Sequence, residues 1–447
     1  MSNPGEADLT PITSVRQLAE WFAAGSRPRS AWKVGTEHEK FGFRRADLAP
    51  PPYEPDGIRA LLEALQARGW TPILDGGNPI GLKRGNASIS LEPGGQLELS
   101  GAVFADLHAT QQELTTHIRE VHEAAGPLDL GFAPLGFHPL ARREDMPWMP
   151  KGRYAIMRRY MPRVGKLGLD MMLRTCTVQA NLDYGDEADM VEKLRVSLAL
   201  QPVATALFAN SPFTEGRPNG FRSFRAQVWT DTDPDRTGIP AVVFEEGFGF
   251  ERFSEWLLDV PMYFVMREGR WLDAAGASFR AFLDGRLNIL PGERATMGDF
   301  ADHVTTAFTD VRLKRFLEMR GADAGSPAML QALPALWVGL LYDDAAQKAA
   351  AALTRGWTVE EIRALRADVP RQALSATIRG RSVRDLARDM VAIARDGLRA
   401  RGLGEDVYLA PLDEIVASGL TQADRLLQLY ERAWDGNAGR ALTAAEI

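Results

Sequence analysis

The chain has 447 residues, of which 45% are hydrophobic and 25% charged, and its 52 Lys and Arg face 59 Asp and Glu for a formal net charge of −7. This is ordinary globular composition, and the acidic balance argues against a broad nucleic-acid-binding surface. The single cysteine, Cys176, excludes an intrachain disulfide and a metal site made of cysteines alone, and it is typical of a reducing compartment.

The N-terminal segment MSNPGEADLTPITSV has no basic region followed by an apolar run, and it is acidic and poor in arginine. It therefore predicts neither a signal peptide nor a transit peptide. The apolar stretch VSLALQPVATALFA is too short to span a membrane and is interrupted by Gln201 and Pro202. We expect a soluble, cytoplasmic protein that uses no membrane and no nucleic acid.

Strands and helices are mixed up to about residue 325. The segment 32–43 (WKVGTEHEKFGF) predicts a strand between two amphipathic helices, for which Ser14 and Asp56 are the expected N-caps. Short segments of alternating polarity, bounded by Gly, Pro or Asn, then predict an antiparallel meander: WTPILD, SISLE and QLELS.

A long helix, a strand and a second long helix are expected next, in FADLHATQQELTTHIREVHEAAG, LRTCTVQANLD and residues 186–209. From about residue 326 the pattern is almost purely helical, with breaks near Gly356-Trp357 and Pro370. Strands with interspersed helices, followed by a helical region, predict an α+β fold rather than a doubly wound sheet.

The strand 32–43 carries two glutamates on one face. Alternate residues of a strand point the same way, so Glu37 and Glu39 are expected about 6.6 Å apart, on the face continued by Phe41 and Phe43. Two ionised carboxylates beside buried aromatic rings need a compensating charge or raised pKa values, and a divalent cation would supply the charge. An edge strand whose glutamates face solvent explains the segment equally well.

Two further segments repeat this pattern. In SISLEPGGQLELSG a Pro-Gly-Gly turn would bring Glu92 and Glu98 onto neighbouring strands, although a polar hairpin face in water is the alternative. In KRFLEMRGAD a strand would project Glu318 and Arg320 to the same side, whereas a helix would not. Three glutamate-bearing segments together predict a cage of oxygen ligands for Mg²⁺.

Several familiar motifs are missing. HEKFG lacks the second histidine of a zinc protease, and GGNPIGLKRG lacks the Gly-Lys-Ser/Thr ending of a Walker A loop. Cys176 is expected to be a buried structural thiol. Basic residues interleaved with aromatic ones favour a small anionic ligand over nucleic acid in this acidic chain; they occur in MPKGRYAIMRRYMP and FRSFRAQVWTDTDPDRTG.

From about residue 12 to the C-terminus, the chain resembles the plant-type and related proteobacterial glutamate–cysteine ligases. The segments that carry the resemblance are GTEHEKFGF, SISLEPGGQLELSGA, MPKGRYAIMRRYMP, LGLDMMLRTCTVQANLD, LFANSPFTEGRPNGF, WTDTDPDRTG and LKRFLEMRGAD. The resemblance implies the first step of glutathione synthesis. ATP phosphorylates the γ-carboxylate of L-glutamate, and the amine of L-cysteine then attacks the acyl phosphate to give γ-glutamylcysteine, ADP and phosphate.

The resemblance also implies a fold and a set of roles. The fold is that of the glutamine synthetase-like carboxylate–amine ligases, a curved, mainly antiparallel sheet that forms a funnel surrounded by helices; a closed sheet would make residues 1–447 a single domain. Arg320 is implied in the phosphoryl contact and Arg225 in gripping glutamate. Tyr154 and Tyr263 would line the amino-acid pocket, Lys151 and Arg153 would contact anions, and the Mg²⁺ ligands would be Glu37, Glu39, Glu92, Glu98, Glu318 and Gln179.

One departure from the family bears on assembly. Plant members carry two redox-sensitive disulfides, and their cysteines correspond here to Gln111 with Gln331 and to Ala274 with Ile289. With Cys176 alone no such switch can operate, so we expect a monomer or a weak homodimer. Two other functions stay open: a ligase with another amine acceptor, and a non-catalytic binder of an amino acid or nucleotide. The five carboxylates with Arg225 and Arg320 argue against the binder.

Overall fold

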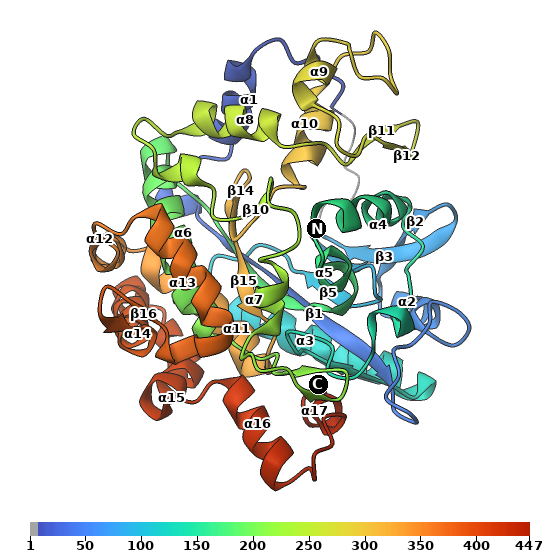
Figure 1. Cartoon of the computed structure of the whole chain (residues 1–447), viewed down its shortest axis with the longest axis vertical. Helices are drawn as coiled ribbons and strands as arrows, with labels where there is room; N and C mark the ends of the chain where they lie inside the picture. The colour runs from blue at the N-terminus through green and yellow to red at the C-terminus, as the bar shows by residue number, and fades with distance from the viewer. Residues whose placement is uncertain (1–7) are drawn as a thin grey trace.

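A nine-stranded antiparallel sheet organises the computed structural model, which describes residues 8–447 (Figure 1). Residues 1–7, which the single-domain prediction and the prediction of no targeting peptide both include, lie outside the described part. The strand order is β14-β15-β7-β1-β5-β4-β3-β2, and β6 pairs with the far end of β1. Its strands are β1 (Val34–Arg44), β2 (Thr71–Asp75), β3 (Asn78–Arg84), β4 (Ala87–Leu91), β5 (Leu97–Ser100), β6 (Leu130–Ala133), β7 (Thr177–Leu182), β14 (Val311–Leu313) and β15 (Leu317–Asp323).

Helices surround this sheet. They are α1 (Val15–Ala23), α2 (Ile58–Gln66), α3 (Leu107–Ala125), α4 (Gly152–Val164), α5 (Gly168–Arg174), α6 (Glu187–Leu207), α7 (Phe224–Val228), α8 (Phe250–Asp259), α9 (Phe279–Leu283), α10 (Met297–Val304), α11 (Pro327–Leu341), α12 (Asp344–Leu353), α13 (Val359–Gln372), α14 (Val383–Arg401), α15 (Ala410–Ser418), α16 (Gln422–Arg432) and α17 (Arg440–Ala444). Four two-stranded pairs complete the fold: β8 (Phe213–Thr214) with β9 (Arg217–Pro218), β10 (Thr237–Gly238) with β13 (Phe308–Thr309), β11 (Phe264–Arg267) with β12 (Arg270–Asp273), and β16 (Thr377–Ile378) with β17 (Arg381–Ser382).

Strand β1 is central, so the edge-strand interpretation of its glutamates is wrong. It pairs with β7 on one side and β5 on the other, and every residue from Val34 to Phe43 is buried. In register, Glu39 faces Glu98 of β5 and Glu37 faces Gln179 of β7. Of the two alternatives left open for KRFLEMRGAD, the structure has the strand, because β15 pairs with β7 and β14.

The α+β fold with a mainly antiparallel sheet is confirmed, but the sheet is open rather than closed. Among the described residues, β14 and β2 are its two edges and do not pair with each other. The loosely phosphate-loop-like segment GGNPIGLKRG contains β3, an additional strand of the meander.

Two local predictions also differ from the structure. Asp56 does not cap α2: Gly57 is the N-cap, and the amides of Ile58 and Arg59 instead donate to the carbonyls of Pro52 (3.0 Å) and Tyr53 (3.1 Å). These backbone bonds supply what a capping side chain otherwise would. Pro370 does not break its helix, because it lies in the last turn of α13.

The C-terminal helices pack on the sheet rather than apart from it. Helix α11, which is almost entirely buried, contacts β1, β7 and α14, and Figure 1 shows the orange and red helices gathered at the lower left. Gly339 of α11 and Gly397 of α14 lie where the two helices cross, since a Cβ at Gly397 would stand 1.9 Å from the Gly339 carbonyl oxygen. The largest cluster of buried hydrophobic residues therefore forms a continuous core with members from Ile12 to Val416, and two smaller clusters complete the interior.

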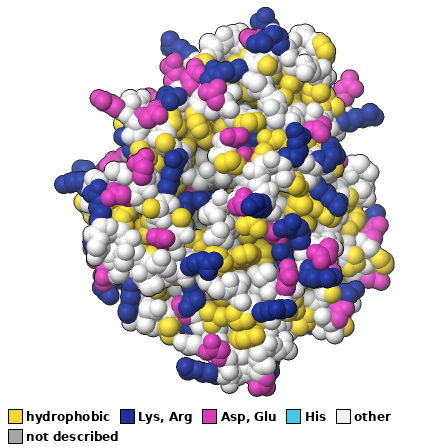
Figure 2. Space-filling view, in the orientation of Figure 1, with side chains coloured by type: hydrophobic (Ala, Val, Ile, Leu, Met, Phe, Trp, Pro, Cys, Tyr) yellow, Lys and Arg dark blue, Asp and Glu magenta, His cyan; other side chains and the backbone are white. Residues whose placement is uncertain are grey.

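The surface is mixed in charge. Figure 2 shows Lys and Arg side chains interspersed with Asp and Glu over the viewed face. In the described chain, none of the helices combines the length and apolarity needed to cross a bilayer.

We predict that His138 makes the stability of this fold depend on pH. Its ring is buried, Nδ1 accepts from the amide of Ala141 (3.0 Å), and burial lowers its pKa to about 3. The unfolded chain, with a histidine pKa of about 6.5, binds this proton more readily, so stability is lost as pH falls below 6.5. Between pH 7.5 and 5.5 the loss amounts to about 1.4 kcal/mol for this group.

Denaturant unfolding at both pH values tests this. His138→Asn keeps an acceptor for the amide but cannot be protonated, so its free energy of unfolding should fall by about 1.4 kcal/mol less than that of the unmodified chain. His122→Asn, at an exposed position of α3, is the matched control and should keep the full pH dependence. An unchanged dependence in His138→Asn would contradict the assignment.

Candidate active site

The face of β1 that carries Glu37 and Glu39 borders a cavity with about 880 Å³ of space, its open mouth included. Strands β1, β5 and β7 supply one wall, and segments from α4, α5, α7 and β15 supply others. The candidate residues that line it are Glu37, Glu39, Glu92, Glu98, Arg153, Tyr154, Gln179, Arg225, Tyr263 and Arg320. Glu318 and Lys151 are not among the lining residues.

Three of the carboxylates form a tight cluster. One oxygen each of Glu39, Glu92 and Glu98 lies within 4.8 Å of the others. Burial raises the pKa of Glu39, and the charges of Glu92 and Glu98 raise it further. Burial and Glu98 likewise raise the pKa of Glu92 to about 7. Burial is the larger cause of both shifts, and the neighbouring carboxylates add to it. Against the effect of burial, the pKa of Glu98 is instead lowered to about 2, with the hydrogen bond from Ser90 among the causes.

The polar contacts around the cluster hold it in position. The amide of Thr177 donates to Glu39 Oε2 (2.9 Å), and the hydroxyl of Ser90 donates to Glu98 Oε2 (2.8 Å). Oε1 of Glu92 is buried without a hydrogen-bond partner among the described residues. Clustered carboxylates with an unsatisfied oxygen are a donor set that fits a divalent cation of the Mg²⁺ or Ca²⁺ type.

Glu37 and Gln179 lie beside this cluster rather than in it. Glu37 Oε1 accepts from Asn181 Nδ2 (2.9 Å), and its register partner Gln179 accepts from Arg320 Nη1 through Oε1 (3.1 Å). Both residues still line the cavity. Of the two, Gln179 is the residue that contacts the guanidinium of Arg320.

Glu318 is placed behind the cavity wall and is surrounded by cations. It is fully buried and accepts from Arg312 Nε (2.6 Å), Arg320 Nη1 (2.9 Å) and Lys314 Nζ (3.3 Å). Burial alone would raise the pKa of Glu318, but Arg312, Lys314 and Arg320 hold it well below its usual value. The structure thus does not bring Glu318 into the carboxylate cluster.

Arg312 was missed by the sequence reasoning. It faces Glu318 across the β14–β15 pair and also lines the cavity. The sequence did hold a signal for this role. Arg312 and Lys314 are two residues apart, in and just after the strand that precedes Glu318, and this spacing places both side chains on one face.

Arg225 is carried by the short helix α7. It is buried, and its Nη2 donates to the carbonyl oxygen of Arg320 (2.9 Å). Arg225 Nε and the indole N–H of Trp229 are both buried without a partner among the described residues. Trp229, which belongs to the basic and aromatic segment expected to bind a small anion, and Phe308, which we did not predict, add an aromatic wall beside these donors.

The two tyrosines expected to line the pocket turn their hydroxyls elsewhere. Tyr154 donates to the carbonyl of Leu91 (2.7 Å), which also accepts from Lys151 Nζ (2.7 Å). Tyr263 donates to Asp233 Oδ2 (3.0 Å), and the partner of Asp233, Arg236, lies 3.7 Å from the centroid of the Tyr263 ring. Lys151 and Arg236 therefore support the lining residues from behind.

Comparison with known proteins identifies the family of this chain. The family model described as glutamate-cysteine ligase family 2 matches residues 33–444. The chain belongs to that family. It is 50% identical over 426 residues to the chloroplastic glutamate–cysteine ligase of Medicago truncatula, which covers 95% of this chain and 83% of the relative. It is 51% identical over 425 residues to that of Arabidopsis thaliana, with 95% and 81% covered.

A solved structure supports the fold. The crystal structure of the glutamate–cysteine ligase of Francisella tularensis, in complex with AMP, aligns with a TM-score of 0.53 at 11% identity, over 93% of this chain and 87% of that chain. The predicted ligase fold is confirmed, because the chain shares its fold with a solved glutamate–cysteine ligase.

The predicted cytoplasmic location is contradicted by the relatives. The glutamate–cysteine ligases of Medicago truncatula, Brassica juncea, Arabidopsis thaliana and Nicotiana tabacum are all named chloroplastic. The expectation rested on the composition of the N-terminal segment, which does not decide the compartment in this family.

We predict that activity depends on the ring of Tyr263, which lines the cavity, and not on its hydroxyl. Tyr263→Phe should keep kcat/KM within about threefold, while the loss of a donor to buried Asp233 lowers the free energy of unfolding by about 1–3 kcal/mol. Tyr263→Leu, which also removes the ring, should lower kcat/KM by about tenfold or more. Steady-state kinetics and denaturant unfolding measure both effects. A large activity loss in Tyr263→Phe at unchanged stability would contradict this division.

Proposed function

We propose that this chain catalyses the ATP-dependent joining of L-glutamate to L-cysteine through γ-glutamyl phosphate, giving γ-glutamylcysteine, ADP and phosphate. The observation that carries the proposal is one cavity, in a member of glutamate–cysteine ligase family 2, that brings a carboxylate cluster together with the buried Arg225 and the partly buried Arg320. ATP and the two amino acids are the substrates that this chemistry requires.

We propose Mg²⁺ as the metal, held by Glu39, Glu92 and Glu98 with Glu37 and Gln179 beside them. In phosphoryl-transfer sites Mg²⁺ takes oxygen ligands, from protein carboxylates together with the phosphates of the substrate. When bound, the ion neutralises charge on the phosphate oxygens. Its positive charge would also relieve the repulsion that raises the pKa values of Glu39 and Glu92.

The arginines serve the transferred groups. Arg320, held by Glu318 and Gln179, presents a fixed guanidinium for the oxygens of the phosphoryl group. Arg225, buried and with Nε unpartnered among the described residues, pairs with a carboxylate of glutamate. Arg153 adds a further positive charge at the cavity wall. In this scheme Glu318 orients Arg312 and Arg320.

The aromatic wall protects the intermediate and receives the amine substrate. Trp229, Tyr263 and Phe308 lie together along one side of the cavity, with the rings of Trp229 and Phe308 5.8 Å apart. Exclusion of water from this side limits hydrolysis of an acyl phosphate before the amine of cysteine attacks it.

We also propose that residues 1–447 form one catalytic domain that acts as a monomer or weak homodimer. The continuous core, which joins the C-terminal helices to the sheet, supports a single domain. The lone cysteine is buried, so no thiol pair within the chain can link α3 and α11 at Gln111 and Gln331.

Product analysis tests the reaction. Purified chain with ATP, Mg²⁺ and glutamate should release phosphate much faster when cysteine is added, and mass spectrometry should identify γ-glutamylcysteine. Glycine and 2-aminobutyrate in place of cysteine measure the choice of amine. Cysteine-dependent phosphate release without γ-glutamylcysteine would refute the proposal.

We predict that Glu39→Gln separates activity from stability. The amide oxygen can still accept from Thr177, and one charge leaves a crowded cluster, so the free energy of unfolding without metal should stay equal or rise. Activity at saturating Mg²⁺ should fall by about 100-fold or more.

Binding of the metal provides a second readout. Mg²⁺ at 100 times its Kd should add about 2.7 kcal/mol to the unfolding free energy of the unmodified chain, and much less to that of Glu39→Gln. Glu63→Gln, on the exposed face of α2, is the matched control and should behave as the unmodified chain. Full activity in Glu39→Gln would exclude a ligand role for Glu39.

A further inference from the structure

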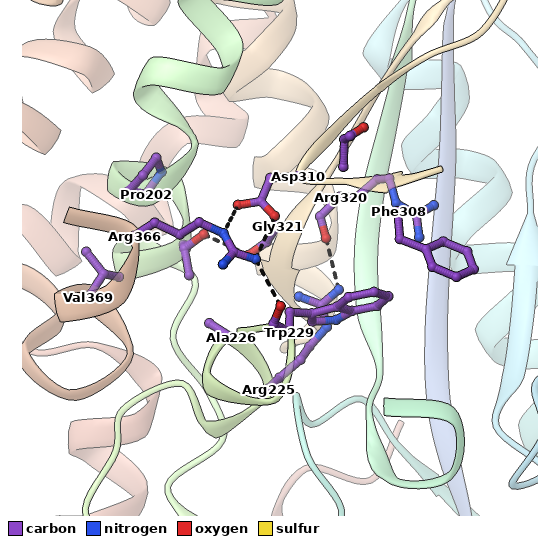
Figure 3. A pocket seen from close by; sticks show the side chains of 12 residues that line it. Pro202, Arg225, Ala226, Trp229, Phe308, Asp310, Arg320, Gly321, Arg366 and Val369 are labelled. Atoms are coloured by element: carbon purple, nitrogen blue, oxygen red, sulfur yellow. Dashed lines mark hydrogen bonds and ion pairs between the residues drawn. The ribbon is translucent and has the colours of Figure 1, made fainter. Parts of the chain in front are cut away.

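A second cavity lies behind the part of the candidate active-site wall that carries Arg225 and Arg320. It shares Arg225, Trp229, Phe308 and Arg320 with the candidate active site and is closed by Asp310 of the β13–β14 connection and Arg366 of α13 (Figure 3). Figure 3 shows the guanidinium of Arg366 between Asp310 and the backbone of Trp229. Arg366, which belongs to the C-terminal helices, thus lies behind the wall that carries Arg225.

Arg366 makes three hydrogen bonds there. Its Nε and Nη2 donate to the two carboxylate oxygens of Asp310 (2.6 and 3.0 Å), and Nη2 also donates to the carbonyl oxygen of Trp229 (3.2 Å). The side chains are 17% and 13% exposed, so solvent weakens this bidentate pair little. Trp229 is the C-cap of α7, whose last carbonyls have no partner within the helix.

The other end of α7 is anchored to the sheet. Ser223, its N-cap, accepts from the amide of Ala226 (3.1 Å) and donates to Asp323 Oδ1 of β15 (2.8 Å). A helix of five residues has little rigidity of its own. The position of Arg225 therefore depends on both anchors, Ser223 at the beginning of α7 and Trp229 at the end.

Asp310 connects the same anchor to Arg320. Its backbone carbonyl accepts from the amide of Arg320 (3.1 Å), and its own amide donates to the carbonyl of Gly238 (2.8 Å). Gly238 has φ +84°, and a Cβ there would stand 3.3 Å from Arg366 Cζ. Glycine at this position accommodates both the left-handed backbone and the close approach of the guanidinium.

We propose that Arg366 is a positioning residue for substrate binding: by joining Asp310 to the C-terminal end of α7, it holds Arg225 and Trp229 in place relative to Arg320. The inference rests on the proposed role of Arg225 in gripping glutamate. Arg366 itself touches no substrate. Its loss should therefore weaken glutamate binding more than it affects the phosphoryl chemistry or ATP binding.

Kinetics of Arg366 variants test the inference. Arg366→Ala should raise KM for glutamate by about tenfold, while KM for ATP and kcat each change by less than about threefold. Arg366→Lys, which can pair with Asp310 but cannot also reach the Trp229 carbonyl in the same fork, should give an intermediate KM for glutamate. Equal changes in the KM values of glutamate and ATP would overturn the proposal.

Arg363 provides a matched control one turn earlier on α13. Its Nε and Nη2 donate to the carbonyl of Ile239 (3.0 and 2.7 Å) instead of to Asp310 and the end of α7. Arg363→Ala should lower stability to a comparable degree, as measured by denaturant unfolding, and leave KM for glutamate unchanged. If Arg363→Ala raised this KM as much as Arg366→Ala, the effect would be a general loss of structure and the proposal would fail.

A double-mutant cycle separates this inference from the function on which it rests. If Arg366 acts through Arg225, then Arg366→Ala should raise KM for glutamate much less in an Arg225→Ala background than in the unmodified chain. Additive effects would overturn the positioning role. An Arg225→Ala variant with normal KM for glutamate would instead refute the proposed role of Arg225.

Discussion

The burial of carboxylates on a central antiparallel strand is the constraint on which the rest of the structure depends. Strand β1 has β5 and β7 on its two sides, so Glu37 and Glu39 cannot turn into solvent at a sheet edge. Two buried charges on one face require either positive charge or protons. The surrounding elements differ in how they compensate these buried charges.

The compensation of buried carboxylate charge differs between the two parts of the site. Around Glu318 the protein supplies the compensation itself, since Arg312, Lys314 and Arg320 all donate to this carboxylate. In the cluster of three carboxylates, in contrast, Glu98 and Glu39 accept hydrogen bonds from neutral groups, the hydroxyl of Ser90 and the backbone amide of Thr177. One carboxylate is therefore used to orient arginines, whereas the other three form a set suited to a cation. This asymmetry, rather than the number of glutamates, is the basis for proposing a structural role for Glu318 and a metal-binding role for the other three.

From the sequence we could predict which glutamates lie together, but not what surrounds them in the fold. Period-two alternation placed Glu37 and Glu39 together, and the Pro-Gly-Gly turn placed Glu92 near Glu98, because both are local properties of strands and turns. Alternation could not decide whether β1 is an edge strand, since that depends on β7, which lies well over a hundred residues further along the chain. The same limit applies to Glu318, because Arg312 reaches it only through the pairing of β14 with β15. The capping error at Asp56 has the same cause, because the carbonyls of Pro52 and Tyr53 satisfy the helix amides only in the folded turn.

The C-terminal helices show most clearly what pattern alone leaves out. Their sequence reads as a helical region that follows the sheet, and nothing in the amphipathic period of α13 distinguishes Arg366 from a solvated arginine. In the fold, the Pro370 carbonyl accepts from the amides of Arg222 and Ser223 (2.8 and 3.0 Å), while Arg366 holds the Trp229 carbonyl (3.2 Å). Helix α13 thus contacts the backbone just before α7 and at its end. Because α7 carries Arg225, the helical region and the sheet build the candidate site jointly, and the side chains that set its geometry are found by following backbone hydrogen bonds rather than by searching for charged motifs.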